Sequence, residues 1–407
     1  MKTILSAASI IIVFISCINQ EPKKQDPKKN DSIVVVSNTI TTKDSANNNE
    51  DYIPDLFEPY KADNYFNNVT AVMCGLKGQA HNLNYLFDSA AWARNGKYID
   101  SSWARVEKNR LRAMRGWAAK EFAKPNANTK IVFYPFSGPD ILTATTFFPN
   151  ADKYIMLGLE PIGKLPDFKK FKKGEHAEYA ADFKHSLEYF FAKSYFITKK
   201  MLNDFQTQKV NGLLPVLTLF IRKSGCEISN IKYIVRYEQD SMVEVSYNYK
   251  NPDHKPTGVR VDFIQNGKPK SVYYFRYDVS DKKFNDTCIF YRYLNKNKNY
   301  ITYIKSASYL LHANFMSNMR KMILKNSKCV VQDDTGIPFK YFSDGKDWDI
   351  KIYGAYSKPV SDFPYLSMQK PLEEAFKKDS ANIGKLPFHL GYHWGSKKDV
   401  IIYAFKK

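Results

Sequence analysis

The sequence has few of the residues that mark several common protein classes. Its 407 residues include only 5 cysteines, 18 glycines and 19 prolines, which excludes a disulfide-dense scaffold, a collagen-like chain and a Gly/Pro-rich low-complexity chain. A single long apolar run lies at the N-terminus, so a protein with several membrane-spanning helices is excluded too. No G-x-S-x-G sequence occurs, and nucleophilic catalysis therefore has no support in the sequence.

The overall composition is that of a folded, basic protein. Apolar residues make up 44%, aromatic residues 15% and charged residues 25% of the chain, which is typical of globular domains. The chain is long enough for one large domain or two smaller ones. Its 61 Lys and Arg exceed its 41 Asp and Glu, which gives a formal net charge of +20. A charge of this sign favours anionic partners.

The first seventeen residues have the pattern of an export signal. A lysine at position 2 precedes an apolar segment, 4–15, and Ser16-Cys17 directly follows this segment. This segment has the length of a secretory signal core and is too short to span a bilayer comfortably. With a small residue directly before Cys17, the pattern resembles the precursors of bacterial lipoproteins. The alternative interpretation is an ordinary cleaved signal peptide followed by an incidental cysteine.

The resemblance implies where the protein resides. Residues 1–16 would be removed, and Cys17 would carry diacylglycerol and an N-acyl chain that anchor the protein in a lipid bilayer. We therefore expect an exported protein, lipid-anchored to the outer membrane, with its body in the periplasm or at the cell surface. Residues 17–58 are polar and punctuated by proline, which predicts a flexible tether.

The body changes composition near residue 225. Apolar residues recur at helical spacing in the first half, 59–225, with long helices expected at 98–124 and 176–205. The second half, 226–407, alternates apolar and polar residues in strand-like runs, and Asn266-Gly267 predicts a type I′ hairpin turn between two of them. We expect an antiparallel meander there. The two halves form separate domains or one continuous domain, 59–407.

The segment 130–160 carries the most specific pattern of the body. It predicts a strand, a turn with Ser137, Gly138 and Asp140, a helix, and a second strand that ends near Glu160. This order and spacing resemble the first βαβ unit of Rossmann-type enzymes, in which an acidic residue meets a ribose. The resemblance implies a ligand pocket on these four residues. The alternative is a well-formed helix start, with Ser137 or Gly138 as N-cap.

The predicted fold class is therefore α/β, or mixed α+β, with a Rossmann-like helix-rich first half packed against an antiparallel, strand-rich second half. Arg110 lies within the apolar stripe of the helix at 98–124. It is a candidate anchor for an acidic ligand or an internal carboxylate; the alternative is an arginine whose charged end reaches solvent at the edge of the stripe.

A lysine cluster at 164–173, interleaved with Phe168 and Phe171, predicts a surface for anionic lipid or acidic glycan. A solvated loop is the alternative. In an exported protein we expect no nucleic acid partner.

Other candidate catalytic or metal-binding residues match known sequence patterns only in part. Asp334-Thr335-Gly336 has the letters of the aspartic-protease signature, but that chemistry needs two copies and the chain has one. His389 and His393 have the spacing of a zinc-binding H-E-x-x-H sequence, but Leu390 replaces the glutamate. We therefore expect no metal site and no cofactor.

Four cysteines remain besides Cys17, and their sequence positions leave their state open. In an exported protein four cysteines permit three disulfide pairings, and four unlinked buried thiols are the alternative. The cysteines are Cys74, Cys226, Cys288 and Cys329.

These observations favour a membrane-anchored envelope lipoprotein whose body has a binding or structural role and is not an enzyme. The alternative is a ligand-binding or enzyme domain with a Rossmann-like pocket formed by the Ser137–Asp140 turn and Glu160.

Overall fold

The structure is a computed structural model, and it covers most of the body of the chain. The described residues are 65–193, 195, 196, 210–237, 241–343, 346–356, 359, 363, 368–378 and 380–407. The predicted signal peptide, Cys17 and the tether lie outside them. None of the helices in these ranges has both the length and the apolar character needed to cross a membrane.

One ten-stranded mixed sheet organises the described part of the chain, in the order β4-β3-β5-β6-β2-β1-β7-β8-β10-β9. Its strands are β1 Ile131–Pro135, β2 Lys153–Gly158, β3 Glu227–Tyr237, β4 Ser241–Ser246, β5 Pro256–Gln265, β6 Lys268–Arg276, β7 Tyr300–Ile304, β8 Ser327–Gln332, β9 Trp348–Gly354 and β10 Val400–Lys406.

The five central strands run parallel and the outer strands run antiparallel. Strand β1 pairs in parallel with both β2 and β7, β2 pairs in parallel with β6, and β7 with β8. The pairs on either side, from β6 outward to β4 and from β8 outward to β9, are antiparallel. This arrangement confirms the predicted mixed α/β class. The sheet takes strands from both sides of residue 226, where the composition changes.

Helices cover the sheet and the connections around it. The α-helices are α2 Tyr65–Cys74, α3 Ala90–Val106, α4 Arg112–Glu121, α5 Ala123–Ala127, α6 Ile141–Phe147, α7 Glu175–Lys193, α9 Leu214–Lys223, α10 Ile289–Lys296, α11 Ser317–Asn326 and α12 Lys370–Lys378. Short 3-10 turns are η1 His81–Asp88, η3 Phe168–Lys170, η4 Leu310–His312, η5 Asn314–Met316, η6 Phe339–Tyr341 and η7 Gly391–Gly395, and η2 Glu107–Leu111 is a π-helical turn.

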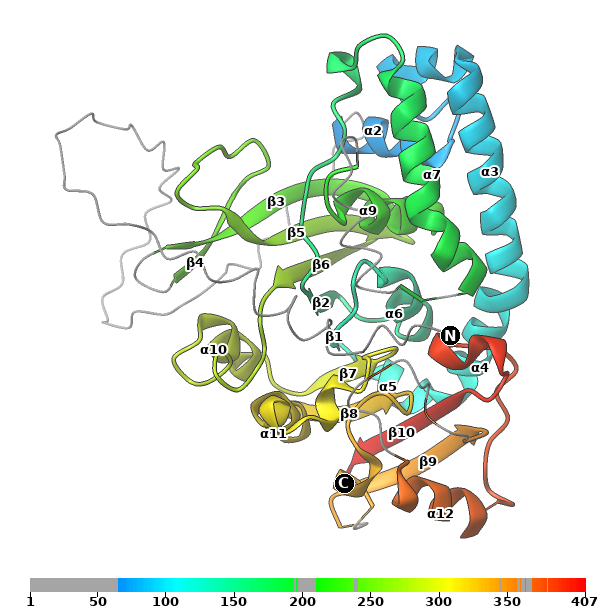
Figure 1. The fold of residues 1–407 in the computed structure, drawn as a ribbon, viewed down its shortest axis with the longest axis vertical. Helices are drawn as coiled ribbons and strands as arrows, with labels where there is room; N and C mark the ends of the chain where they lie inside the picture. The colour runs from blue at the N-terminus through cyan, green and yellow to red at the C-terminus, as the bar shows by residue number, and fades with distance from the viewer. Residues whose placement is uncertain are drawn as a thin grey trace, which may run out of the picture.

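The two faces of the sheet bury two separate apolar cores. Successive residues of a strand point to opposite faces, so Val132 and Tyr134 of β1 pack in one core while Phe133 packs in the other. Residues of α4, α6, α7 and α9 join the first core. Residues of α10 and α11 join the second core, on the side where Figure 1 shows these two helices beside β7 and β8.

The strand–helix–strand unit at 130–160 is confirmed, as β1, α6 and β2 in parallel. The hairpin at Asn266-Gly267 is confirmed as well, because both residues have positive φ (51° and 74°) between paired Gln265 and Lys268.

Other predictions need correction. The helix predicted at 98–124 already begins at Ala90, contains the π turn and ends at Glu121. The first four strands after 226 pair with one another in antiparallel fashion but form no simple meander, since β3 lies between β4 and β5. The second half is not antiparallel throughout, because β7 and β8 belong to the parallel centre of the sheet. Strand β7 was not predicted, and the last part of the helix predicted at 176–205 lies outside the described residues.

The chain reverses its path across the sheet between β1 and β7. From β1 it crosses through α6 to β2 on one side, and from β7 it crosses through α11 to β8 on the other. The two crossover helices lie in different cores and hence on opposite faces. Neighbouring parallel strands whose crossovers leave in opposite directions form a topological switch point, and in open α/β sheets ligands bind outside the carboxyl ends of the strands there.

Candidate functional site

Five charged side chains gather at the carboxyl ends of β1, β7 and β8, next to the switch point. We call Asp140, Lys305, Asp333, Asp334 and His393 the carboxyl-edge cluster. All five are buried, with exposed fractions of 1–8%. Asp140 belongs to the turn after β1, Lys305 directly follows β7, and the two aspartates directly follow β8. His393 comes from η7, near the end of the chain.

The centre of this cluster is an ion pair across the switch point. The Lys305 ammonium contacts Asp140 Oδ2, and both side chains are 2% exposed. Asp140 is also the N-cap of α6, where its Oδ1 accepts from the Thr143 backbone N–H at 3.2 Å. Its Oδ2 accepts further bonds from the Thr143 hydroxyl at 2.7 Å and the Tyr134 hydroxyl at 3.1 Å. These bonds offset the cost of desolvating the two charges.

The turns after β7 and β8 are tied together through Asp333. Its Oδ2 accepts from the Ser306 backbone N–H at 2.8 Å, and its Oδ1 accepts from the backbone N–H of Thr335 at 3.0 Å. The Thr335 hydroxyl donates to Asp333 and accepts from the Ala307 backbone N–H at 2.8 Å. Gly391 of η7 lies directly above, since a Cβ there would stand 2.9 Å from Asp333 Oδ2. The two strand ends therefore form one rigid unit.

The neighbouring Asp334 uses only one of its two oxygens. Its Oδ2 accepts from the Tyr309 hydroxyl at 2.7 Å and faces His393 Nε2 at 3.4 Å. Oδ1 of the same carboxylate is buried and has no hydrogen-bond partner among the described residues. The hydroxyl oxygen of Ser306, in the turn after β7, is likewise buried and has no hydrogen-bond partner among the described residues. Because buried polar atoms normally have partners, each of these two oxygens is a candidate acceptor for a donor from a ligand.

The backbone of these turns is held in a conformation that side chains usually avoid. Ser306, Ser308 and Tyr309 have φ of 54°, 53° and 56°, and Phe136 in the turn after β1 has 58°. Residues other than glycine rarely occupy this left-handed region, and such strain concentrates at functional sites. Its presence in two turns at one sheet edge favours a function for this edge.

The buried environment shifts the pKa of three groups at this edge. Burial and the adjacent charge of Asp334 raise the pKa of Asp333 to about 6. Burial alone would lower the pKa of His393, but the hydrogen bond and charge of Asp334 outweigh it and raise that pKa. Burial lowers the pKa of His312, which lies beside Asp334, to about 4. At neutral pH His312 is thus neutral.

The four residues predicted to bind a ligand on the βαβ unit are positioned by contacts of the turn after β1 and of the end of β2. Ser137 is buried, and its hydroxyl donates to the carbonyls of Gly138 and Leu157, at 3.0 and 3.4 Å. Gly138 supplies the turn with a φ of 51°. Asp140, and neither Ser137 nor Gly138, is the N-cap, which corrects that prediction. Glu160 is 2% exposed and accepts from the Tyr274 hydroxyl at 3.0 Å, so its carboxylate is bound to a side chain of β6.

Arg110 is buried at the end of another helix. It lies in the π turn and donates to the carbonyls of Phe190, Phe191 and Ala192, at 2.9–3.1 Å. These carbonyls belong to the last turn of α7, where a cation is favourable. Its guanidinium also stacks on the Trp394 ring, 4.2 Å from the centroid.

The remaining sequence candidates have ordinary environments. His389 and His393 face different carboxylates, Asp399 at 2.6 Å and Asp334 at 3.4 Å, and the described residues hold no group of three ligands suited to a metal ion. The four cysteines after Cys17 are buried, and none of them forms a disulfide with another described residue.

In the basic cluster, Phe168 and Phe171 pack against each other and on Tyr179, while the lysines are exposed. The two rings therefore belong to the core and do not form an aromatic surface.

A scan of protein-family models, a search of curated proteins and a search of solved structures each found no match to this chain.

The raised pKa of Asp333 predicts a specific pH dependence of stability. A carboxyl group that binds its proton more tightly in the folded than in the unfolded state contributes to the free energy of unfolding. This contribution is greatest below the pKa of the unfolded state, near 4, and it is lost as pH rises through the pKa of the folded state. With a folded pKa of about 6, the loss between pH 4 and pH 7 is on the order of 2–3 kcal/mol. Asp333→Asn cannot titrate, so denaturant unfolding should show this slope in the wild type and not in the variant.

The exposed Asp349 provides the control. Asp349→Asn should keep the wild-type slope. Equal slopes for the wild type and Asp333→Asn would show that Asp333 does not carry a shifted proton.

Proposed function

We propose that this chain is a lipid-anchored, exported protein whose body binds a small, hydroxyl-rich ligand at the carboxyl-edge cluster. The observation that carries the proposal is the buried Asp334 Oδ1, which has no hydrogen-bond partner among the described residues. It lies at the edge of an α/β sheet where ligands bind in other folds of this class.

The arrangement of donors around Asp334 supports this proposal. Both protein groups that face the carboxylate, Tyr309 and His393, serve its Oδ2. A buried carboxylate oxygen without a donor costs free energy, because its hydration is lost and not replaced. A ligand hydroxyl would restore one bond to Asp334 Oδ1 and could also pair with the Ser306 hydroxyl. Sugars and other polyols carry such groups at the required density.

Binding is favoured over catalysis because the other acids of this edge already have structural partners. Asp140 caps a helix and pairs with Lys305, and Glu160 bonds to Tyr274. Asp333 accepts from two backbone N–H groups. General acid–base catalysis needs a group within reach of substrate, and among the described acids of this edge only Asp334 has a buried oxygen without a hydrogen-bond partner.

The anchor rests on the sequence before the described residues. Ser16-Cys17 at the end of the apolar segment supplies the lipid-attachment pattern, and the polar residues 18–58 supply a tether. The tether holds more acidic than basic residues, so the positive charge lies in the body. Exposed lysines at 164–173 would then face anionic lipid or acidic glycan at the envelope.

The ligand proposal predicts that neutral sugars bind through Asp334. In calorimetric titrations of the full chain with glucose, galactose and N-acetylglucosamine, we expect at least one to bind. Asp334→Asn removes the charge of the acceptor, and hydrogen bonds to charged groups contribute about 1.5–3 kcal/mol, so its Kd should rise at least tenfold. Ser306→Ala, a milder change at a half-buried residue, should raise it by a smaller factor.

Asp349→Asn is the matched control, since it removes a carboxylate at an exposed position. Thermal unfolding of each variant establishes that it is folded. Unchanged affinity in both Asp334→Asn and Ser306→Ala, or no binding of any of these sugars at millimolar concentration, would refute the ligand proposal.

The anchor proposal predicts lipid on Cys17. Bacteria expressing the chain and fed an alkyne analogue of palmitate should label the wild type and Cys288→Ala, because the latter keeps the lipid-attachment residue. The Cys17→Ala variant should carry no label and should no longer be found in the membrane fraction. A label that survives Cys17→Ala would disprove the anchor and leave the ligand proposal untouched.

A further inference from the structure

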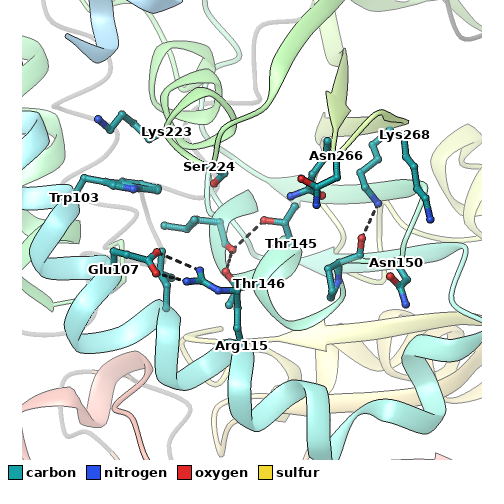
Figure 2. A pocket seen from close by; sticks show the side chains of 15 residues that line it. Trp103, Glu107, Arg115, Thr145, Thr146, Asn150, Lys223, Ser224, Asn266 and Lys268 are labelled. Atoms are coloured by element: carbon teal, nitrogen blue, oxygen red, sulfur yellow. Dashed lines mark hydrogen bonds and ion pairs between the residues drawn. The ribbon is translucent and has the colours of Figure 1, made fainter. Parts of the chain in front are cut away.

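A cavity lies at the edge of the sheet opposite to the carboxyl-edge cluster, at the amino ends of the parallel strands. It has a volume of about 480 Å³, which is within the range of small-molecule sites. Its walls are the long helical segment 90–121 and the β5–β6 hairpin, and Thr145 and Thr146 of α6 lie between them in Figure 2. None of the residues of the carboxyl-edge cluster lines this cavity.

A π turn shapes the helical wall. Four residues of this helical wall line the cavity, each four positions after the last: Trp103, Glu107, Leu111 and Arg115. An α-helix turns about 100° per residue, so twelve residues overshoot three full turns by about 120°. The π turn at 107–111 absorbs an extra residue and keeps the four side chains on one face. Its effect is visible in the contact between Glu107 and Arg115, eight residues apart. Turns of this type occur frequently at functional sites.

The lining carries an excess of positive charge. Arg115, Lys223, Lys268 and Lys270 line the cavity, against the single acid Glu107. Lys270 is buried and donates to the Pro149 carbonyl at 2.8 Å and to that of Ala151, and Lys223 pairs with Asp100 at 2.6 Å.

Two of these cations keep capacity for a ligand. Lys268 is exposed and has no ion pair with any described residue. Two guanidinium nitrogens of Arg115 donate to the Glu107 carboxylate. The other N–H groups of this guanidinium remain available for a ligand.

The cavity also offers an aromatic face and a hydrogen-bond acceptor. Trp103 is half-buried in the helical wall, and its ring borders the cavity in Figure 2. On the hairpin side, the Oε1 of Gln265 is buried and has no hydrogen-bond partner among the described residues. A ring with a hydroxyl group would satisfy both features, because aromatic side chains pack on ring faces and the amide oxygen accepts from a hydroxyl.

We propose that this cavity binds a ring compound that carries one carboxylate or phosphate group and several hydroxyls, such as a sugar acid or sugar phosphate. Arg115 and Lys268 bind the anionic group from opposite walls. Trp103 packs on the ring, and Gln265 accepts from a hydroxyl. This site is separate from the carboxyl-edge cluster, and the proposal does not rest on the function proposed for that cluster.

Calorimetric titration of the full chain with glucuronate, glucose 6-phosphate and glucose tests the proposal. At least one of the two anions should bind, with glucose at least tenfold weaker at this site. Lys268→Ala should weaken the anion several-fold, and Lys268→Glu at least tenfold because it reverses the charge. Trp103→Leu should weaken the anionic sugar and leave any binding of inorganic phosphate unchanged. Preference for glucuronate or for glucose 6-phosphate distinguishes a carboxylate from a phosphate site.

Two controls make the result specific. Lys282→Ala removes an exposed lysine outside the cavity and should leave the affinity unchanged. Asp334→Asn should leave binding of the anion unchanged, which separates this site from the carboxyl-edge cluster. The proposal is overturned when neither anion binds at millimolar concentration, when glucose binds to Asp334→Asn, in which the carboxyl-edge cluster is impaired, as tightly as the anions do, or when Lys268→Glu retains wild-type affinity.

Discussion

The ion pair between Lys305 and Asp140 is the contact on which the carboxyl edge of the sheet depends. It joins the turn after β1 to the turn after β7 across the switch point, where no crossover helix connects the two strands. Asp140 also starts α6, and the backbone next to Lys305 binds Asp333 in the turn after β8. Loss of one partner of a buried pair leaves an uncompensated charge and costs about 3–5 kcal/mol. This one contact therefore links the turns that follow three neighbouring strands.

The two edges of the sheet have different properties that suit different ligands. At the carboxyl edge the charged groups are buried, and a carboxylate oxygen of Asp334 has no hydrogen-bond partner among the described residues. At the amino edge the charged side chains around the cavity are mostly cationic, and Lys268 is exposed and unpaired among the described residues. A neutral polyol fits the first edge and an anionic ring fits the second.

Local patterns in the sequence predict the elements that depend on local interactions. The unit β1-α6-β2 follows from two apolar runs and a turn that contains Gly138, and the β5–β6 hairpin follows from Asn266-Gly267. The exact N-cap was not predictable, because Ser137, Gly138 and Asp140 all suit a helix start. Asp140 takes this role since its carboxylate also has Lys305 as a partner.

The site residues were not predictable, because their partners are distant in sequence. Lys305 meets Asp140 across 165 positions, and His393 meets Asp334 across 59. Nothing in the letters of Asp334-Thr335-Gly336 shows that a histidine faces the aspartate. The useful signal was charge directly after a buried apolar strand, as at Lys305 after β7. Similarly, the buried Arg110 was recognisable as unusual, but its carbonyl partners at the end of α7 depend on how two helices pack.

The coupling free energy between Asp140 and Lys305 tests this account most directly. Equilibrium unfolding of the wild type, Asp140→Asn, Lys305→Met and the double variant gives that energy as a double-mutant cycle. If this ion pair links the two turns at the switch point, each single substitution should lower the free energy of unfolding strongly. The double substitution should lower it by much less than the sum of the two, which corresponds to a coupling free energy of at least about 2 kcal/mol. Additive single changes, with coupling near zero, would contradict the central role assigned to this ion pair.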